Sequence, residues 1–335
     1  FSTYKKLQIA VNNGDANMAY QLVRKGAMAA VSSEPNTTAD TTRLIVTPIR
    51  RDQPDVLRAL LSGDEPLPEA VADQALAAAL LATKTDALSL LLSHKIKPSS
   101  QELNNWISEQ QPDDQHPHIL VLREQYQDFS MLLASSLEGA LDSHNLSLAN
   151  QLMAVSPATL ADLSNRLCCQ NSEDAVGITL SKPIPVETGP MQRAATIAGS
   201  GPTMKWLTEQ QLSVDHADAS GKTALMWATI YRQYANISAL LKLGAEVNAQ
   251  DNRGRTALIY AQLPREDFQW GSRWFARRFR PGIHYAVQAE MLWAGANPYL
   301  RDKRGMSALS YGHTLTREGE TIPIARALRF VESTK

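Results

Sequence analysis

The stretch "DASGKTALMWATIYRQYANISALLKLGAEVNAQ", residues 218–250, decides the fold of this chain, because its opening pattern returns directly after it. The stretch "DNRGRTALIYAQ" restarts the pattern at Asp251, 33 residues after Asp218. A third, partial copy, "RDKRGMSALSYGH", begins at residue 301, and "AEMLWAGANPYL" precedes it with the end of a helix. A fixed period of this length is typical of small structural repeats, which stack on one another to bury a continuous core.

The recurring residues predict a tight turn followed by two short helices. A glycine three residues after the aspartate suits a turn that needs a positive φ, and the hydroxyl residue two positions later can cap the first helix. Alanine and leucine then face inward on both helices, and a second glycine ends the pair. The turn glycines are Gly221, Gly254 and Gly305, the capping residues are Thr223, Thr256 and Ser307, and the helix-ending glycines are Gly244 and Gly295.

The pattern D-x-x-G-x-T-A-L-x-x-A…L-L-x-x-G-A-x-x-N resembles the ankyrin repeat. The resemblance implies an all-α solenoid that binds other proteins without catalysis, through its turn tips and the exposed side of each first helix. More degenerate helix pairs are expected at residues 7–27, 46–63, 75–98, 131–157 and 192–214. We therefore predict an all-α, ankyrin-type α-solenoid of about seven or eight helix pairs.

Two segments are expected to interrupt the array. Residues 99–130 are polar and contain the loop "QQPDDQHPH", and residues 165–190 contain "SKPIPVETGP", which favours an extended loop. We predict degenerate helical repeats over residues 1–165, an irregular segment over 166–190 and clear repeats over 191–335.

One repeat carries an insertion. The step from Asp251 to Asp302 is 51 residues, and the surplus is "PREDFQWGSRWFARRFRPG", residues 264–282, between the first and second helices of that repeat. Tryptophan and arginine are enriched at interface hot spots, and arginine pairs with carboxylates through two hydrogen bonds. Two interpretations stay open: the insertion presents a basic and aromatic patch to a partner, or its aromatic side chains fold back to cover the solenoid.

The charge of the chain is uneven. Its formal net charge is −1, but residues 251–335 hold 14 Lys and Arg against 8 Asp and Glu, and residues 1–250 hold 19 against 26. The basic end favours a partner with an acidic surface. Because the basic patch is short and the rest of the chain is acidic, we expect no nucleic acid; "RWFARRFR" is also too short to favour membrane-surface binding.

No motif in the sequence predicts catalysis, a cofactor or a metal. "SGKT" at residues 220–223 lacks the earlier glycine of a phosphate-binding loop, because that position is His216. His116 and His118 have no companion ligands at zinc spacing. Cys168 and Cys169 are adjacent and do not form a disulfide framework, and no apolar run is long enough to cross a membrane. We predict that the chain is not an enzyme.

The ankyrin resemblance places a partner on the turn tips, the first helices and the neighbouring insertion. The predicted partner-binding residues are Lys222, Tyr231, Arg253, Arg255, Phe268, Trp270, Arg273, Trp274, Arg277, Arg278, Arg280, Arg301, Lys303 and Arg304.

The irregular repeats favour one dedicated partner. The Ala-, Gln- and Leu-rich composition suggests a bacterial protein, and bacterial ankyrin-repeat proteins of this kind include immunity proteins that neutralise a toxin, such as a type VI secretion effector. We expect such an inhibitor to occlude the active site of the toxin. The alternatives are a secreted effector that binds host proteins and an assembly adaptor. The sequence begins at Phe1, so we expect a signal or lipid anchor removed before it, which favours the bacterial periplasm over the cytoplasm.

Overall fold

The computed structural model of the protein describes residues 3–27, 37–63, 67–82, 84–169, 189–263, 281–315 and 323–334. These residues form two compact units. Unit 1 comprises Phe1–Ala140 and Ser147–Asp162, and unit 2 comprises Leu141–Leu146 and Leu163–Lys335. Within the described ranges the regular structure is α-helical, which confirms the predicted all-α solenoid of helix pairs.

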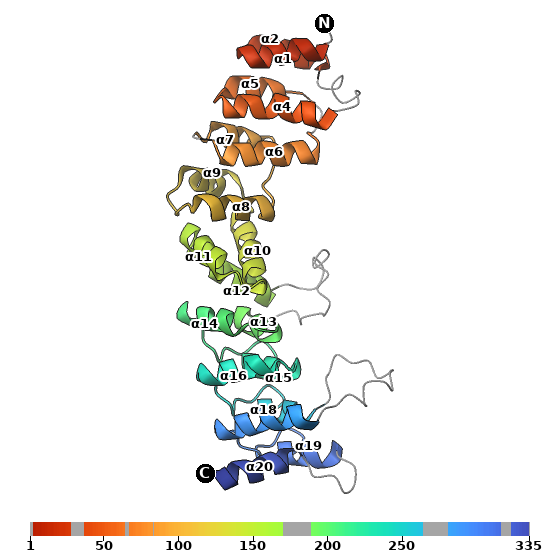
Figure 1. Ribbon diagram of the computed structural model, residues 1–335, viewed down its shortest axis with the longest axis vertical. Helices are drawn as coiled ribbons and strands as arrows, with labels where there is room; N and C mark the ends of the chain where they lie inside the picture. The colour runs from red at the N-terminus through yellow and green to blue at the C-terminus, as the bar shows by residue number, and fades with distance from the viewer. Residues whose placement is uncertain are drawn as a thin grey trace. The chain divides into compact units, whose positions relative to one another are not determined.

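Unit 1 begins with four helix pairs (Figure 1). The first helices stack as α1 on α4, α4 on α6 and α6 on α8, while the second helices stack as α2 on α5, α5 on α7 and α7 on α9. The core lies between these two layers, with Leu7, Leu44, Leu57, Leu76 and Leu88 all at most 2% exposed. The pairs are α1 (Thr3–Asn13) and α2 (Ala16–Arg24), α4 (Thr37–Arg50) and α5 (Pro54–Leu61), α6 (Glu69–Leu80) and α7 (Asp86–Ser93), and α8 (Ser100–Gln110) and α9 (Pro117–Gln125).

Three helices follow, where the chain passes from one unit to the other. They are α10 (Phe129–Asp142), α11 (Leu146–Val155) and α12 (Thr159–Cys169). Cys168 and Cys169 are the last two residues of α12, and most of the predicted extended loop, residues 170–188, lies outside the described residues.

Unit 2 repeats the two-layer arrangement. The first helices α13, α15, α17 and α19 stack in that order, and the second helices α14, α16, α18 and α20 do the same. The pairs are α13 (Pro190–Thr196) and α14 (Gly201–Glu209), α15 (Ala224–Ile230) and α16 (Tyr234–Lys242), α17 (Ala257–Gln262) and α18 (Pro281–Trp293), and α19 (Ala308–Leu315) and α20 (Pro323–Thr334).

The prediction that residues 99–130 interrupt the array is wrong. They form α8 and α9, which pack on the preceding pair. Ser99 and Glu102 form a capping box at the start of α8, and the buried residues Leu103, Trp106 and Ile107 are spaced along one helical face. The polar composition therefore belongs to the outer face of a helix and to the turn at residues 111–116.

The glycines of the repeat behave as the sequence predicts, and two of the three predicted capping residues do so. Gly221, Gly254 and Gly305 have φ values of +78°, +75° and +77° in the turns. Gly244 and Gly295 have positive φ where α16 and α18 end. Thr223 and Thr256 are the N-cap residues of α15 and α17, but the side chain of Thr223 makes no capping hydrogen bond, contrary to the prediction. The hydroxyl of Thr256 accepts a hydrogen bond from the backbone N–H of Ile259, and that of Ser307 accepts one from Ser310.

His118 gives unit 1 a predictable pH dependence. Its ring is 4% exposed and lies against Trp106 and His116, at centroid distances of 5.9 and 5.3 Å. Its Nε2 lies 3.2 Å from the carbonyl oxygen of Ala79, while its Nδ1 is buried without a hydrogen-bond partner. Burial lowers the pKa of His118, and the charge of His116 lowers it further.

We expect the free energy of unfolding to fall as the pH drops from 7.5 to 5.5. The unfolded chain takes up a proton near pH 6.5 while folded His118 resists it, so the stabilisation is present above that pH and is lost below it. Urea unfolding at both pH values tests this, with His118→Gln as the variant and the exposed His216→Gln as its control. The loss on acidification should shrink in His118→Gln alone. If His118→Gln loses as much stability on acidification as the wild type, His118 does not cause the loss.

Candidate protein-binding surface

The turns of unit 2 are built around a buried or half-buried aspartate. One carboxylate oxygen of Asp251 accepts hydrogen bonds from the backbone N–H groups of Arg253 and Arg255, both at 2.8 Å. In the next turn Asp302 accepts the same two bonds from Arg304 and Met306, at 2.9 and 3.0 Å. These bonds close the turn and fix the backbone from which the tip side chains project.

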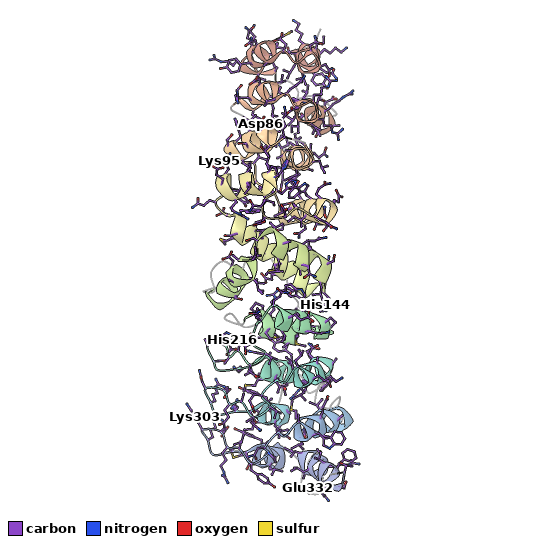
Figure 2. All side chains as sticks on the ribbon, turned by 90° about the vertical axis from the view of Figure 1, so that its left-hand side faces the viewer. Asp86, Lys95, His144, His216, Lys303 and Glu332 are labelled. Carbon is purple, nitrogen blue, oxygen red and sulfur yellow. The ribbon has the colours of Figure 1, made fainter. Side chains whose placement is uncertain are left out.

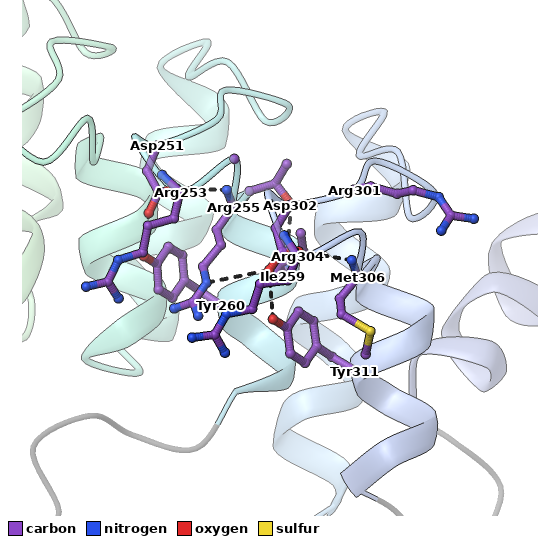
Figure 3. Close-up of polar contacts among 12 residues, drawn as sticks. Asp251, Arg253, Arg255, Ile259, Tyr260, Arg301, Asp302, Arg304, Met306 and Tyr311 are labelled. Atoms are coloured by element: carbon purple, nitrogen blue, oxygen red, sulfur yellow. Dashed lines mark hydrogen bonds and ion pairs between the residues drawn. The ribbon is translucent and has the colours of Figure 1, made fainter.

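The second carboxylate oxygen binds an aromatic side chain on the first helix. Asp251 accepts a hydrogen bond from the hydroxyl of Tyr260 at 2.6 Å, and Asp302 accepts one from Tyr311 at 2.7 Å (Figure 3). In the preceding turn Asp218 accepts one from the indole N–H of Trp227 at 2.7 Å. Each turn is therefore clamped to its own helix by an aspartate and an aromatic residue nine positions later.

Burial shapes the titration of these clamps. Burial raises the pKa of Tyr260, and so does the hydrogen bond to Asp251. Burial alone would raise the pKa of Asp302, but hydrogen bonds from Tyr311, Met306 and Arg304 outweigh it and hold that pKa below its ordinary value. These hydrogen bonds therefore keep the carboxylate of Asp302 charged at neutral pH.

Adjacent turns are joined by two hydrogen bonds that keep the same register. The N–H of Asn252 donates to the carbonyl of Ser220 at 3.0 Å, and the N–H of Lys303 donates to the carbonyl of Arg253 at 2.9 Å. These are the same positions of consecutive repeats.

A second type of hydrogen bond between adjacent repeats also recurs. Its acceptor is the side chain three residues before the aspartate of the turn. Asp215 accepts from the N–H of Glu246 at 2.8 Å, and Asn248 accepts from the N–H of Asn297 at 2.7 Å. The 51-residue repeat thus stacks like the 33-residue one.

The chain on either side of the insertion is tied to the array. The guanidinium group of Arg232 donates hydrogen bonds to the carbonyls of Tyr260 and Leu263, where α17 ends. On the far side, Glu290 of α18 accepts a hydrogen bond from Ser238 of α16 at 2.7 Å. The predicted position of the insertion, between the first and second helices of one repeat, agrees with α17 and α18.

Three predicted partner-binding residues are exposed at the turn tips. The side chains of Arg253, Lys303 and Arg304 make no ion pair or hydrogen bond with any residue that the structure describes. Figure 2 shows that the turns carrying His216 and Lys303 project to one side of the helices of unit 2. These three side chains, which we call the basic tips, are held at fixed backbone positions and are free to bind an anion.

Two further predicted residues are engaged within their own turns. Arg301 is exposed, but its guanidinium group donates a hydrogen bond to the carbonyl of Gly305 at 2.9 Å. The ammonium group of Lys222 donates to the hydroxyl of Ser220 at 3.0 Å and lies 4.9 Å from the ring centroid of Trp227. Both cations flank the basic tips, and each already contacts other residues of its own repeat.

The structure corrects the prediction for Tyr231 and Arg255, which are each 7% exposed and do not face a partner. Tyr231 packs against Trp227 at the end of α15. The guanidinium group of Arg255 lies over the ring of Tyr260, and its Nε is 3.8 Å from the carboxylate of Asp302. Arg255 therefore links two repeats and stabilises their packing.

The predicted residues of the insertion lie outside the described residues, and their role stays a prediction. They are Phe268, Trp270, Arg273, Trp274, Arg277, Arg278 and Arg280.

The aspartate and aromatic residues that clamp each turn to its helix were not among the residues predicted from the sequence. A signal for them was present, because an aspartate and an aromatic residue nine positions apart occur in all three copies, at 218 and 227, 251 and 260, and 302 and 311. The spacing is longer than a helical turn, and it becomes meaningful only once the turn folds back on the helix.

Metal-binding clusters and membrane-spanning helices are both absent from the part of the chain that the structure describes. Among the residues that the structure describes, no three or more His, Cys, Asp or Glu side chains are grouped to hold a metal ion. Within the same part of the chain, every helix is too short or too polar to span a bilayer.

Comparison with known proteins agrees with the geometry of unit 2. Residues 166–251 and 191–267 match a family model of ankyrin repeats in three copies. No curated protein shows a significant match to the chain. Residues 166–267 therefore contain ankyrin repeats, which indicate a protein-binding module.

Proposed function

We propose that this protein is an inhibitor that binds one dedicated protein partner through the basic tips and neutralises it, as an immunity protein neutralises a toxin. The observation that carries the proposal is the fixed placement of Arg253, Lys303 and Arg304 on adjacent turns, without partners among the described residues. Because the backbone of the tips is already ordered, binding costs only the ordering of the side chains, which favours one tight partner over many weak ones.

The charge of the surface suggests how inhibition works. Guanidinium groups pair with carboxylates through two hydrogen bonds, and a positive patch speeds the encounter with an acidic surface. A toxin whose active-site cleft is rimmed by acidic residues fits this description. The inserted segment, residues 264–282, starts from the same repeat and would cover that cleft. A bacterial source and a periplasmic location are part of the proposal.

Charge reversal of the basic tips tests the proposal. The triple variant Arg253→Glu, Lys303→Glu and Arg304→Glu should weaken partner binding by at least about a hundredfold, because three attractions become repulsions. The measurement is capture of partner from the native organism, followed by titration of the purified pair. A matched control reverses three exposed cations on second helices of the same unit: Lys205→Glu, Lys242→Glu and Arg329→Glu.

The outcomes test separately where the partner binds and whether binding inhibits it. Stoichiometric capture of one protein that arrests growth when expressed alone, with capture lost only in the tip variant, supports both. Equal capture by the tip variant and the wild type would move the binding site elsewhere, and a variant lacking residues 266–280 then tests the insertion. A captured protein that is harmless on its own would overturn inhibition and favour an adaptor or effector role.

A further inference from the structure

Unit 1 contains an open groove between two first helices, α4 and α6. The two helices pack side by side (Figure 1). The groove has a volume of about 710 Å³. It lies in unit 1, so it shares no residue with the basic tips of unit 2.

The lining follows the helical period on both walls. On α4 it includes Arg43, Val46 and Arg50, and on α6 it includes Gln74, Ala77 and the neighbouring Ala78. Residues three, four and seven positions apart lie on one face of a helix, so each helix presents a continuous stripe to the groove. The alanines of α6 leave room between the stripes.

The groove exposes apolar surface. Leu81, which follows α6 and lines the groove, is 60% exposed, and Ala77 is also exposed. The hydroxyl oxygen of Thr42, another lining residue, is buried without a hydrogen-bond partner. A large aliphatic side chain left in water beside small residues suits a partner that covers it with its own aliphatic side chains.

The free charge of the groove is positive. Arg43 and Arg50 are exposed, and neither guanidinium group makes an ion pair or hydrogen bond with a described residue. The carboxylate of Asp52, the acidic group in the described lining, is already paired with Lys84 at 2.5 Å. Two arginines thus remain on one wall, available to anionic groups.

The spacing of the arginines selects the shape of the partner. They are seven residues apart, or two helical turns and about 10.5 Å along α4. A partner helix places carboxylates at i and i+7 at the same distance and on the same face. A partner strand reaches about 10 Å in three residues, and an odd step turns the second side chain to the opposite face.

We propose that the groove between α4 and α6 binds an acidic amphipathic helix of a partner protein. The aliphatic face of that helix covers Leu81 and the alanines of α6, and two carboxylates on it pair with Arg43 and Arg50. This is the helix-in-groove mode of recognition, and it provides the chain with a second interaction surface.

The test uses a stapled, fluorescent helical peptide of about 16 residues, long enough to follow α4. It carries leucines on one face and glutamates at i and i+7 beside them. Fluorescence anisotropy measures its binding to the full chain. The variant Arg43→Glu and Arg50→Glu should bind it at least about tenfold more weakly, because two surface ion pairs become repulsions.

The controls isolate charge and position. The variant Lys6→Glu and Lys25→Glu changes the net charge equally at exposed sites on α1 and at the end of α2, and should bind like the wild type. Leu81→Asp should weaken binding without changing either arginine. A peptide with lysines in place of the glutamates should bind the Arg43→Glu and Arg50→Glu variant better than the wild type, because the charges are exchanged.

Three results would overturn the proposal: no binding of the acidic peptide to the wild type, equal binding by the Arg43→Glu and Arg50→Glu variant, or equal binding of the lysine peptide to the wild type. Self-association of the wild type that the same variant abolishes would instead assign the groove to a second copy of the chain. Each result is independent of the basic tips, since none of the substitutions lies in unit 2.

Discussion

Asp251→Ala should lower the stability of unit 2 by about 3–5 kcal/mol, the range typical of a buried charged group whose hydrogen bonds are all removed. The carboxylate is 7% exposed and accepts two backbone N–H groups and the hydroxyl of Tyr260. Truncation leaves all three donors without their acceptor in a site that water reaches poorly. It also opens the turn that carries Arg253.

Equilibrium urea unfolding of the full chain, with amide hydrogen exchange across residues 251–262, measures the effect. Tyr260→Phe is the matched control, because it removes one hydrogen bond and keeps the ring, and should cost only about 1 kcal/mol. Comparable losses in the two variants would contradict the account, since the backbone bonds of the turn would then contribute nothing.

The turn glycines should show a graded response to alanine. Gly221→Ala places a Cβ 2.7 Å from the backbone nitrogen of Asn252 in the next turn, and Gly254→Ala places one 3.1 Å from that of Lys303. Gly305→Ala meets nothing within 4 Å, although all three glycines have φ near +75°. We expect losses of about 1 kcal/mol at Gly305, for the backbone conformation alone, and roughly 2–4 kcal/mol at Gly221, where a clash is added.

Gly254→Ala should fall between these limits. The shift of the urea midpoint in the three variants, at an unchanged slope, is the measurement. Equal losses at all three positions would mean that φ alone sets the requirement for glycine. The next turn would then move away from the added Cβ without a loss of stability.

Much of the fold was predictable because the repeat places each special residue at a fixed offset. A positive φ in a tight turn selects glycine locally, so Gly221 and Gly254 could be assigned without knowing what packs around them. The pair α8 and α9 was also encoded, by Ser99 and Glu102 as a capping box and by the spacing of Leu103 and Ile107. The polar residues between these signals made the segment resemble a loop.

The candidate surface was harder to predict, because exposure depends on contacts between residues far apart in the chain. Arg253 and Arg255 flank the same glycine and look equivalent in the sequence, yet one is exposed and the other is 7% exposed. The difference comes from Asp302, which lies 3.8 Å from the Nε of Arg255 and belongs to the next repeat. The groove between α4 and α6 likewise required knowing which helices become neighbours.

The register of the turns is the same on both sides of the long repeat, whatever the length of the segment inserted in it. Asn252 and Lys303 make the same inter-turn bond, although one step along the chain is 33 residues and the other is 51, and Arg232 ties down the end of α17. If the insertion is the recognition element, as proposed, changes of sequence within it would redirect the protein to a new target while the turns keep this register, and a foreign binding loop could be grafted at the same place.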